Sequence, residues 1–126
     1  KGGERSNMTY REVFQIISGI ETEPGVTIPC AYYQFPEDDP NNPAPPPPFI
    51  CYYYPESNDF LADDVNYQNI RSLTIELYCD NKDFILEKAV EDALTSNGFV
   101  YSKAEDYIES EKLYMTTYYT EVIING

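Results

Sequence analysis

A proline-rich stretch limits the folds open to this chain more than any other feature of its sequence. Residues 36–48 contain seven prolines, of which the last four, Pro45, Pro46, Pro47 and Pro48, are consecutive. Proline has no N–H group to donate to a β ladder, so this stretch cannot be a central strand. We expect an extended polyproline II segment that separates two strand-like regions.

The first of two predicted helices begins at Thr9. Thr9 and Glu12 have the spacing of a capping box, in which each side chain accepts a hydrogen bond from a free backbone N–H. Gly19 and the Pro24–Gly25 pair are expected to end this helix. One apolar stripe follows the cap at helical spacing: Val13, Ile16, Ile17 and Ile20.

The second predicted helix begins near Asp80 and ends at Asn97–Gly98, a typical left-handed stop. Glu87, Glu91 and Asp92 are expected on its outer side. Its apolar stripe consists of Leu86, Ala89, Val90, Ala93 and Leu94.

Period-two patterns predict strands in the rest of the chain. Residues 28–35 and 49–54 are rich in Tyr, Phe and Ile, and residues 99–107 and 113–124 form a predicted antiparallel hairpin around a turn at 109–111. In residues 71–79, one face carries Leu73, Ile75, Leu77 and Cys79. The expected order is α-β-β-β-α-β-β, an α+β fold with a mainly antiparallel sheet and both helices packed on one face.

Charge and residue inventory exclude several function classes. The chain has 22 acidic and 8 basic residues, a formal net charge of −14, and no histidine. Such a surface repels phosphate, so neither nucleic-acid nor membrane binding is expected. Without histidine, a Ser-His-Asp triad is impossible. Cys30, Cys51 and Cys79 are odd in number and far apart, which predicts reduced thiols. We therefore predict no catalytic, cofactor or metal site, and a non-enzymatic protein.

Tyrosine is the residue type that points to an interaction surface. The chain has 13 tyrosines and no tryptophan. Tyrosines at consecutive strand positions must face both sides of a sheet, and helices on one face leave the other open. Either that face is simply exposed, or another subunit covers it, since Tyr is enriched at interfaces. Together with the long connections 36–48 and 55–68, the candidate interface residues are Tyr32, Tyr33, Pro45, Pro46, Pro47, Pro48, Tyr52, Tyr53, Tyr54, Phe60 and Leu61.

The chain length of 126 residues fits one domain. Residues 1–7 are small or polar and precede Met8, so we interpret them as the remnant of an expression tag, with a single α+β domain over residues 8–126. The longest apolar runs are far shorter than the ~20 residues that span a bilayer.

Several stretches resemble small tail proteins of long-tailed phages and prophages, nearest to the tail terminator or tail completion family. These are residues 8–14 (MTYREVF), 52–60 (YYYPESNDF), 70–78 (IRSLTIELY) and 119–124 (YTEVII), with Asn66, Tyr67, residues 82–84 (KDF), Glu87, Gly98 and Phe99 between them. The resemblance implies an α+β subunit of a hexameric ring that ends the tail tube and joins it to the head connector. It further implies a location in the host bacterial cytoplasm during assembly and then in the virion tail.

Two alternatives stay open. The first is another virion or tail-assembly component, or a non-viral interaction module with the proline-rich segment as its ligand. The second is a hydrolase that uses carboxylates alone. The proline-rich segment has no counterpart in the pattern of the tail proteins.

Overall fold

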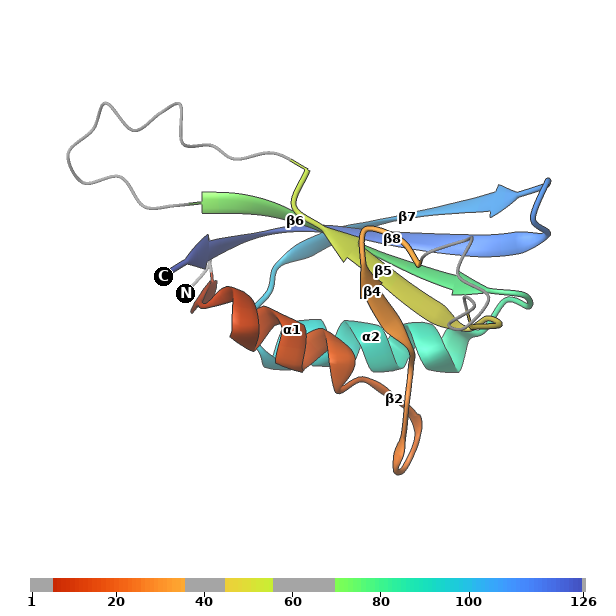
Figure 1. Ribbon diagram of the computed structural model, residues 1–126, viewed down its shortest axis with the longest axis horizontal. Coiled ribbons are helices and arrows are strands. Elements are labelled where there is room, and N and C mark those ends of the chain that lie inside the picture. Colours follow the sequence, from red (N-terminus) through yellow and green to blue (C-terminus); the bar gives the residue numbers. More distant parts are fainter. Residues whose placement is uncertain (1–5, 36–44, 56–69, 126) are drawn as a thin grey trace.

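A computed structural model describes residues 6–35, 45–55 and 70–125 of the chain. The class is α+β, with two helices and a large sheet (Figure 1). The elements are β1 (Ser6–Met8), α1 (Tyr10–Ser18), β2 (Glu21–Glu23), β3 (Val26–Thr27), β4 (Cys30–Tyr32), β5 (Phe49–Tyr53), β6 (Ile70–Cys79), α2 (Phe84–Ser96), β7 (Tyr101–Ile108) and β8 (Leu113–Ile124).

The main sheet is mixed, which corrects the prediction of a mainly antiparallel sheet in the order α-β-β-β-α-β-β. Its described strands lie in the order β1-β8-β6-β5-β4, and β7 pairs with β8 beside β1. The β5–β6, β6–β8 and β7–β8 pairs are antiparallel, but β4 is parallel to β5 and β1 is parallel to β8. A parallel pair needs a connection of a dozen residues or more. Residues 33–48 provide that length between β4 and β5. The proline content predicts only an extended segment there, and not a connection between parallel strands.

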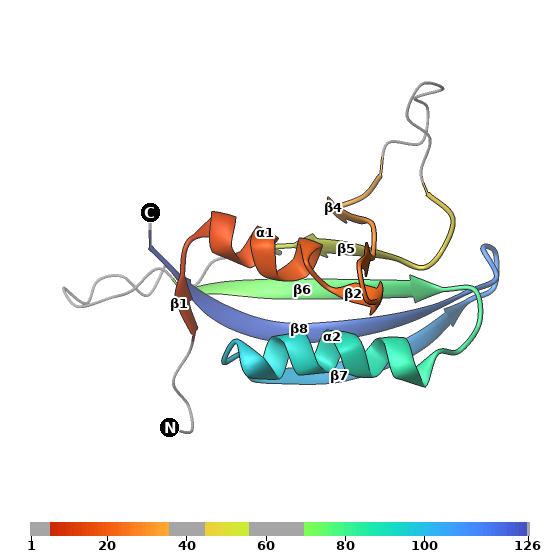
Figure 2. The same ribbon diagram turned by 90° about the horizontal axis from the view of Figure 1, so that it is seen from below.

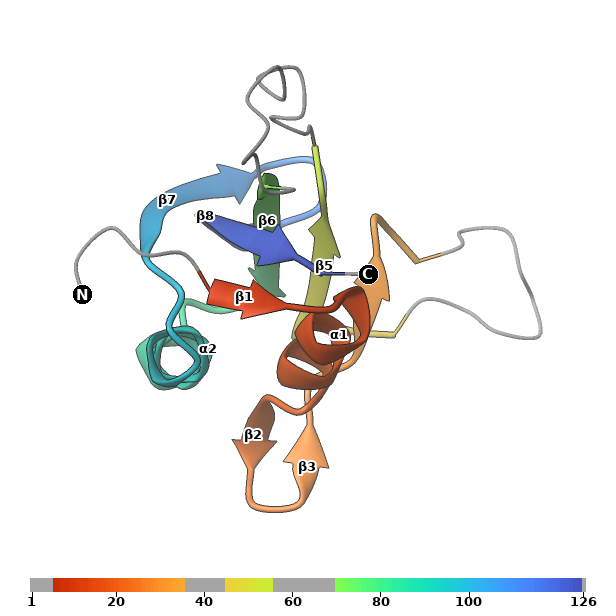
Figure 3. The same cartoon turned by 90° about the vertical axis from the view of Figure 1, so that its left-hand side faces the viewer.

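Two further elements depart from the sequence prediction. β1 includes Ser6 and Asn7, which pair with Val122 and Ile123 of β8, so residues set apart as a tag remnant contribute to the sheet. β2 and β3 form a small hairpin that projects from the rest of the molecule (Figure 3). Its turn is Pro24–Gly25, where Gly25 has a φ of +85° that favours glycine. From the sequence, this pair is expected only to end the first helix, whereas α1 ends at its C-cap Gly19.

Both helices lie on the same face of the main sheet (Figure 2). The capping box of α1 is present: Glu12 N donates to Thr9 Oγ1 at 3.1 Å, and Thr9 N donates to Glu12 Oε1 at 2.8 Å. The helix α2 begins three residues later than predicted, because Asp83 rather than Asp80 is its N-cap. The Asp83 side chain accepts a hydrogen bond from Leu86 N at 2.9 Å. We call the helix side the covered face of the sheet and the other side the open face.

The hydrophobic core lies between the helices and the covered face. The predicted stripe of β6 is buried there, with Leu73 and Ile75 fully inaccessible to solvent. From the helices, the core takes Val13, Ile17, Leu86, Val90 and Leu94. The apolar spacing in the sequence therefore identified the main contacts between helices and sheet.

An ionic network joins α2 to β7 and corrects the expectation that Glu87 and Glu91 face outward. Glu87 is 3 % exposed and pairs with Lys82 and Lys103, whose Nζ lies 3.0 Å from Glu87 Oε1. Lys103 also lies 2.7 Å from Glu91, which accepts a hydrogen bond from Tyr118 at 2.9 Å. Burial alone would raise the pKa of Glu87, but its two lysine partners hold it below its ordinary value. A charge removed from water is tolerated because it is paired.

Within the described residues, neither α1 nor α2 is long and apolar enough to cross a membrane.

Candidate functional site

A groove lies on the open face of the sheet. Its volume is about 840 Å³, in the range of small-molecule and peptide sites. Alternate residues of β5 and β6 form its floor, and the chain before β5 and the β7–β8 turn form its rims. We call it the open-face groove; its lining is Tyr33, Gln34, Phe35, Pro45, Pro47, Phe49, Cys51, Tyr53, Glu76, Tyr78, Asp80, Ile108, Glu111, Lys112 and Leu113.

Stacked aromatic pairs form two walls of this groove. Tyr33 stacks on Tyr53 with 4.9 Å between ring centroids, and Phe49 stacks on Tyr78 at the same distance. Phe35 meets Phe49 edge to face at 5.5 Å. Tyr33 is held with a φ of +72° and its side chain is 59 % exposed. The walls thus offer flat apolar surface to an incoming side chain.

Glu76 lies between the two walls and is fixed by both. Its carboxylate accepts hydrogen bonds from Tyr78 Oη at 2.7 Å and from Tyr53 Oη at 3.2 Å. Burial is the main reason that the pKa values of Tyr53 and Tyr78 are raised, and Glu76 adds to it, so both hydroxyls stay protonated donors. No lysine or arginine in the described part of the chain forms an ion pair with Glu76. The groove therefore presents an oriented carboxylate that pairs with no described lysine or arginine, although Lys112 belongs to the lining.

Cys51 lies opposite Glu76 in the β5–β6 ladder. Burial, followed by the charge of Glu76, raises the pKa of this thiol to about 11. The nucleophilic form of cysteine is the thiolate, so Cys51 is a protonated, packed side chain at neutral pH. Chemically, the groove is suited to holding a cationic or aromatic group.

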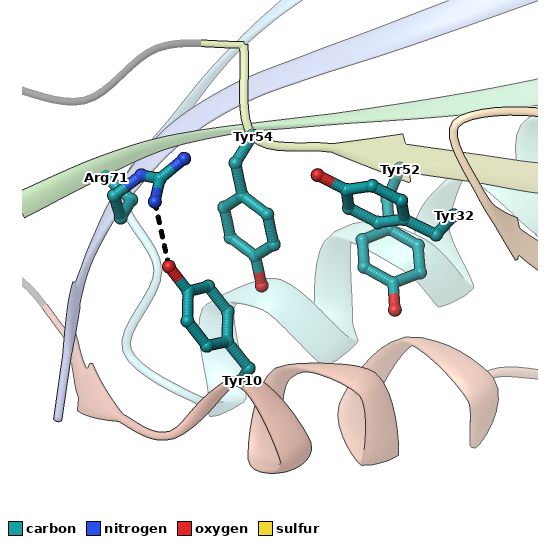
Figure 4. Close-up of a pocket in the computed structure, with 5 residues that line it drawn as sticks. All are labelled: Tyr10, Tyr32, Tyr52, Tyr54 and Arg71. Atoms are coloured by element: carbon teal, nitrogen blue, oxygen red, sulfur yellow. Dashed lines mark hydrogen bonds between the residues drawn. The ribbon is translucent and has the colours of Figure 1, made fainter. Parts of the chain in front are cut away.

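A second, smaller recess lies on the covered face between α1 and the edge of the sheet (Figure 4). Its volume is about 310 Å³, and we call it the Arg71 pocket. Arg71 Nη1 donates to Tyr10 Oη at 2.8 Å, and the guanidinium lies 5.5 Å from the Tyr54 ring centroid. Tyr10 and Tyr54 meet edge to face at 5.1 Å. Tyr32 and Tyr52 complete the lining.

Two polar atoms of the Arg71 pocket are buried without a hydrogen-bond partner among the described residues. They are Arg71 Nε and Tyr54 Oη. Burial is the main reason that the pKa of Tyr54 is raised, so its hydroxyl keeps its proton. Arg71 Nε can only donate, whereas Tyr54 Oη can donate or accept. The positive charge of this pocket therefore comes from the Arg71 guanidinium alone.

The structure distributes the predicted interface residues between the two recesses. Tyr33, Tyr53, Pro45 and Pro47 line the open-face groove, whereas Tyr32, Tyr52 and Tyr54 line the Arg71 pocket. Pro46 and Pro48 line neither recess, and residues 47 and 48 form a bend just before β5. Phe60 and Leu61 lie outside the described residues, as do residues 36–44 of the proline-rich segment and the acidic residues at positions 59, 63 and 64.

Sequence reasoning missed Phe49, Glu76, Tyr78, Tyr10 and Arg71 as site residues. The alternation of β6 did place Glu76 on the face opposite Ile75, but the register that sets Glu76 beside β5 could not be derived from one sequence. The pairing of Phe49 with Tyr78 depends on that same register.

No group of three or more Cys, Asp or Glu side chains in the described ranges could hold a metal ion. Comparisons with protein-family models, curated proteins and solved structures found no match to the chain.

Proposed function

We propose that this chain is a non-enzymatic structural protein of a phage or prophage tail. In this proposal it forms a ring that ends the tail tube and joins it to the head connector. Other tail or head-connector proteins are its further partners, the host cytoplasm is its place of assembly, and the virion tail is its final location. The family resemblance of the sequence supports the tail assignment.

The open-face groove is the observation that carries the proposal. Both helices cover one side of the sheet, which leaves a wide aromatic recess on the other. Tyrosine is enriched at protein–protein interfaces, and recesses that an aromatic or arginine side chain of the partner fills are common there. Four of the residues that we named as interface candidates from the sequence line this groove. A subunit that must contact neighbours in a ring needs such a surface.

The negative charge of the chain is consistent with the same role. A tail lumen must let DNA pass, and a surface that repels phosphate would not retain it. The same charge opposes assembly of free subunits, because each copy carries a formal net charge of −14. We therefore expect association to be weak at low salt and to strengthen as salt screens the repulsion.

The alternative of an interaction module with a proline-rich ligand is less well supported. Pro45 and Pro47 line the groove of their own chain, so the described end of the segment forms part of a groove rim. A ligand segment would instead project for another domain to bind.

An assembly assay tests the proposal. Purified protein is added to open tail tubes built from the tube protein encoded near this chain, and tube ends are examined by electron microscopy. We expect rings at one end and joining of added heads. The variant Tyr33→Asn should lose both activities, because it removes an exposed groove ring. The control Tyr107→Asn changes a similarly exposed tyrosine outside the groove and should retain them. Bare tube ends with wild-type protein would reject the proposal.

A further inference from the structure

The negative charge of the open-face groove calls for a cation from outside the groove. Glu76, Asp80 and Glu111 line it against one basic residue, Lys112. Glu76 is fixed by two tyrosine hydroxyls between two aromatic walls. Arginine fits such surroundings, because its planar guanidinium stacks on aromatic rings and binds carboxylates with two parallel hydrogen bonds.

Only one described cation is available to fill this place from a second copy of the chain. The described ranges hold six basic residues, of which four are engaged and one lies in the groove itself. Arg71 donates to Tyr10, Lys88 pairs with Asp92, and Lys82 and Lys103 belong to the network around Glu87. Arg11 is the remaining one: it is exposed, and its guanidinium has no partner among the described residues.

Arg11 lies beside an exposed aromatic side chain. It is in the first turn of α1, and Phe14 follows at i+3, so the two are neighbours on the helix surface. The Phe14 side chain is 48 % exposed. A cation next to an exposed ring matches the groove, which combines a carboxylate with aromatic walls.

The two surfaces lie on opposite sides of the molecule. The helix α1 is on the covered face (Figure 1). Glu76 and its aromatic walls are on the open face, because they alternate with the buried residues of β5 and β6. A contact between two different surfaces is heterologous, and it produces a closed ring or an open filament rather than a two-fold dimer.

We propose that the open-face groove of one copy receives Arg11 and Phe14 of a second copy, with the Arg11 guanidinium on the Glu76 carboxylate. This inference rests on the proposed function, because a ring subunit must have a heterologous contact. Phe14 packs against the aromatic walls of the groove. Repetition of this contact from each copy to the next builds the ring.

A charge-reversal cycle tests this pairing. Self-association is measured by sedimentation velocity at about 0.15 M salt, where the Debye length is about 8 Å, for the wild type, Arg11→Glu, Glu76→Lys and the double variant. Each single change should weaken association at least about tenfold, since it places like charges opposite each other. The double variant should recover most of the loss. Circular dichroism checks that each variant folds, and Glu76→Gln is a milder substitute for Glu76→Lys.

The control is Lys88→Glu, which makes the same charge change at an exposed site on α2. If Arg11→Glu associates as well as Lys88→Glu and the wild type do, the pairing is wrong although the proposed function stands. If the wild type neither associates in solution nor forms rings on tail tubes, both the pairing and the proposed function fail.

Discussion

The two faces of β6 differ in what holds their side chains. On the covered face, Ile75 is fully buried by packing that any apolar neighbour of suitable shape could supply. On the open face, the adjacent Glu76 is fixed by two specific hydrogen bonds from Tyr53 and Tyr78. The first arrangement stabilises the fold, whereas the second orients a charge and leaves it unneutralised within the described chain. Adjacent residues of one strand thus differ in role: Ile75 stabilises the fold, and Glu76 is the residue to which we assign recognition.

The largest expected effect is on the covered face. Ile75→Ala should lower the free energy of unfolding by about 2–5 kcal/mol, because it leaves a cavity in the core. The control Ile85→Ala alters an isoleucine on α2 whose side chain is 82 % exposed, and it should change stability by less than about 0.5 kcal/mol. Urea unfolding measures both. Equal effects would show that the assignment of the faces is wrong.

The ionic network should rank next. Glu87→Gln removes a buried charge that two lysines share, and we expect the free energy of unfolding to fall by about 1–3 kcal/mol. The loss is not larger because both lysines keep access to water or to another carboxylate. Asp92→Asn is the control, because its pair with Lys88 is exposed and is worth about 0.5 kcal/mol or less. A Glu87→Gln variant as stable as Asp92→Asn would mean that the network does not contribute.

The same network predicts a pH dependence. The pKa of Glu87 is lowered in the folded chain, so its contribution is present above its unfolded pKa of about 4.3 and disappears as the pH falls through the folded value. The stability difference between the wild type and Glu87→Gln should therefore be constant from pH 7 to about pH 5 and shrink below about pH 4. The pKa values of Lys82 and Lys103 are raised, so the lysine contribution is lost only at strongly alkaline pH. A difference that stays the same at pH 3 would contradict this pairing.

Cys51 reports on packing at the floor of the open face. Burial raises its pKa to about 11, so less of Cys51 is thiolate at pH 8. Alkylation by iodoacetamide at that pH should be at least about tenfold slower than in the urea-unfolded chain. Mass spectrometry of the Cys51 peptide measures the rate. Reaction as fast as in the unfolded chain would mean that this floor is open to solvent.

The smallest effect on stability should come from Glu76 itself. In Glu76→Gln, both tyrosine hydroxyls keep an acceptor, although a neutral one, and we expect a change within about 1 kcal/mol. Self-association should nevertheless fall, because the charge that Arg11 meets is gone. Thermal unfolding and sedimentation of the same sample give both quantities. A large loss of stability would assign Glu76 to the fold rather than to recognition.

The sequence predicted the covered face far better than the open one. Apolar spacing identified Val13, Ile17, Leu73, Ile75 and Leu77 as core residues. Packing between helix and sheet requires apolar residues at helical spacing in one and at every second position in the other, and a single sequence shows both patterns. The open face depends on which strands are neighbours. The parallel β4–β5 pair arises through a long connection, and β1 is a short polar segment without a period, so neither had a local signal.

The candidate site was predictable only in part for the same reason. Consecutive tyrosines at positions 52 and 53 had to face opposite sides of the sheet, but the alternation alone did not say which of the two lies on the open face. The hydrogen bonds of Glu76 with Tyr53 and Tyr78 depend on the β5–β6 register, which one sequence does not give. Arg11 can be singled out among the cations only when the contacts of the other lysines and arginines are known.

Concentration-dependent NMR tests the central claim most directly, that the open-face groove is the self-association surface. Backbone amide signals are followed as the concentration of the wild-type protein rises at constant salt. We predict that signals of Tyr53, Glu76 and Tyr78 and those of Arg11 and Phe14 shift together, while the signals of Val90 and Leu94, buried on α2, stay in place. Shifts confined to another surface, such as the outer edge of β7, or no shifts at any concentration would contradict the account.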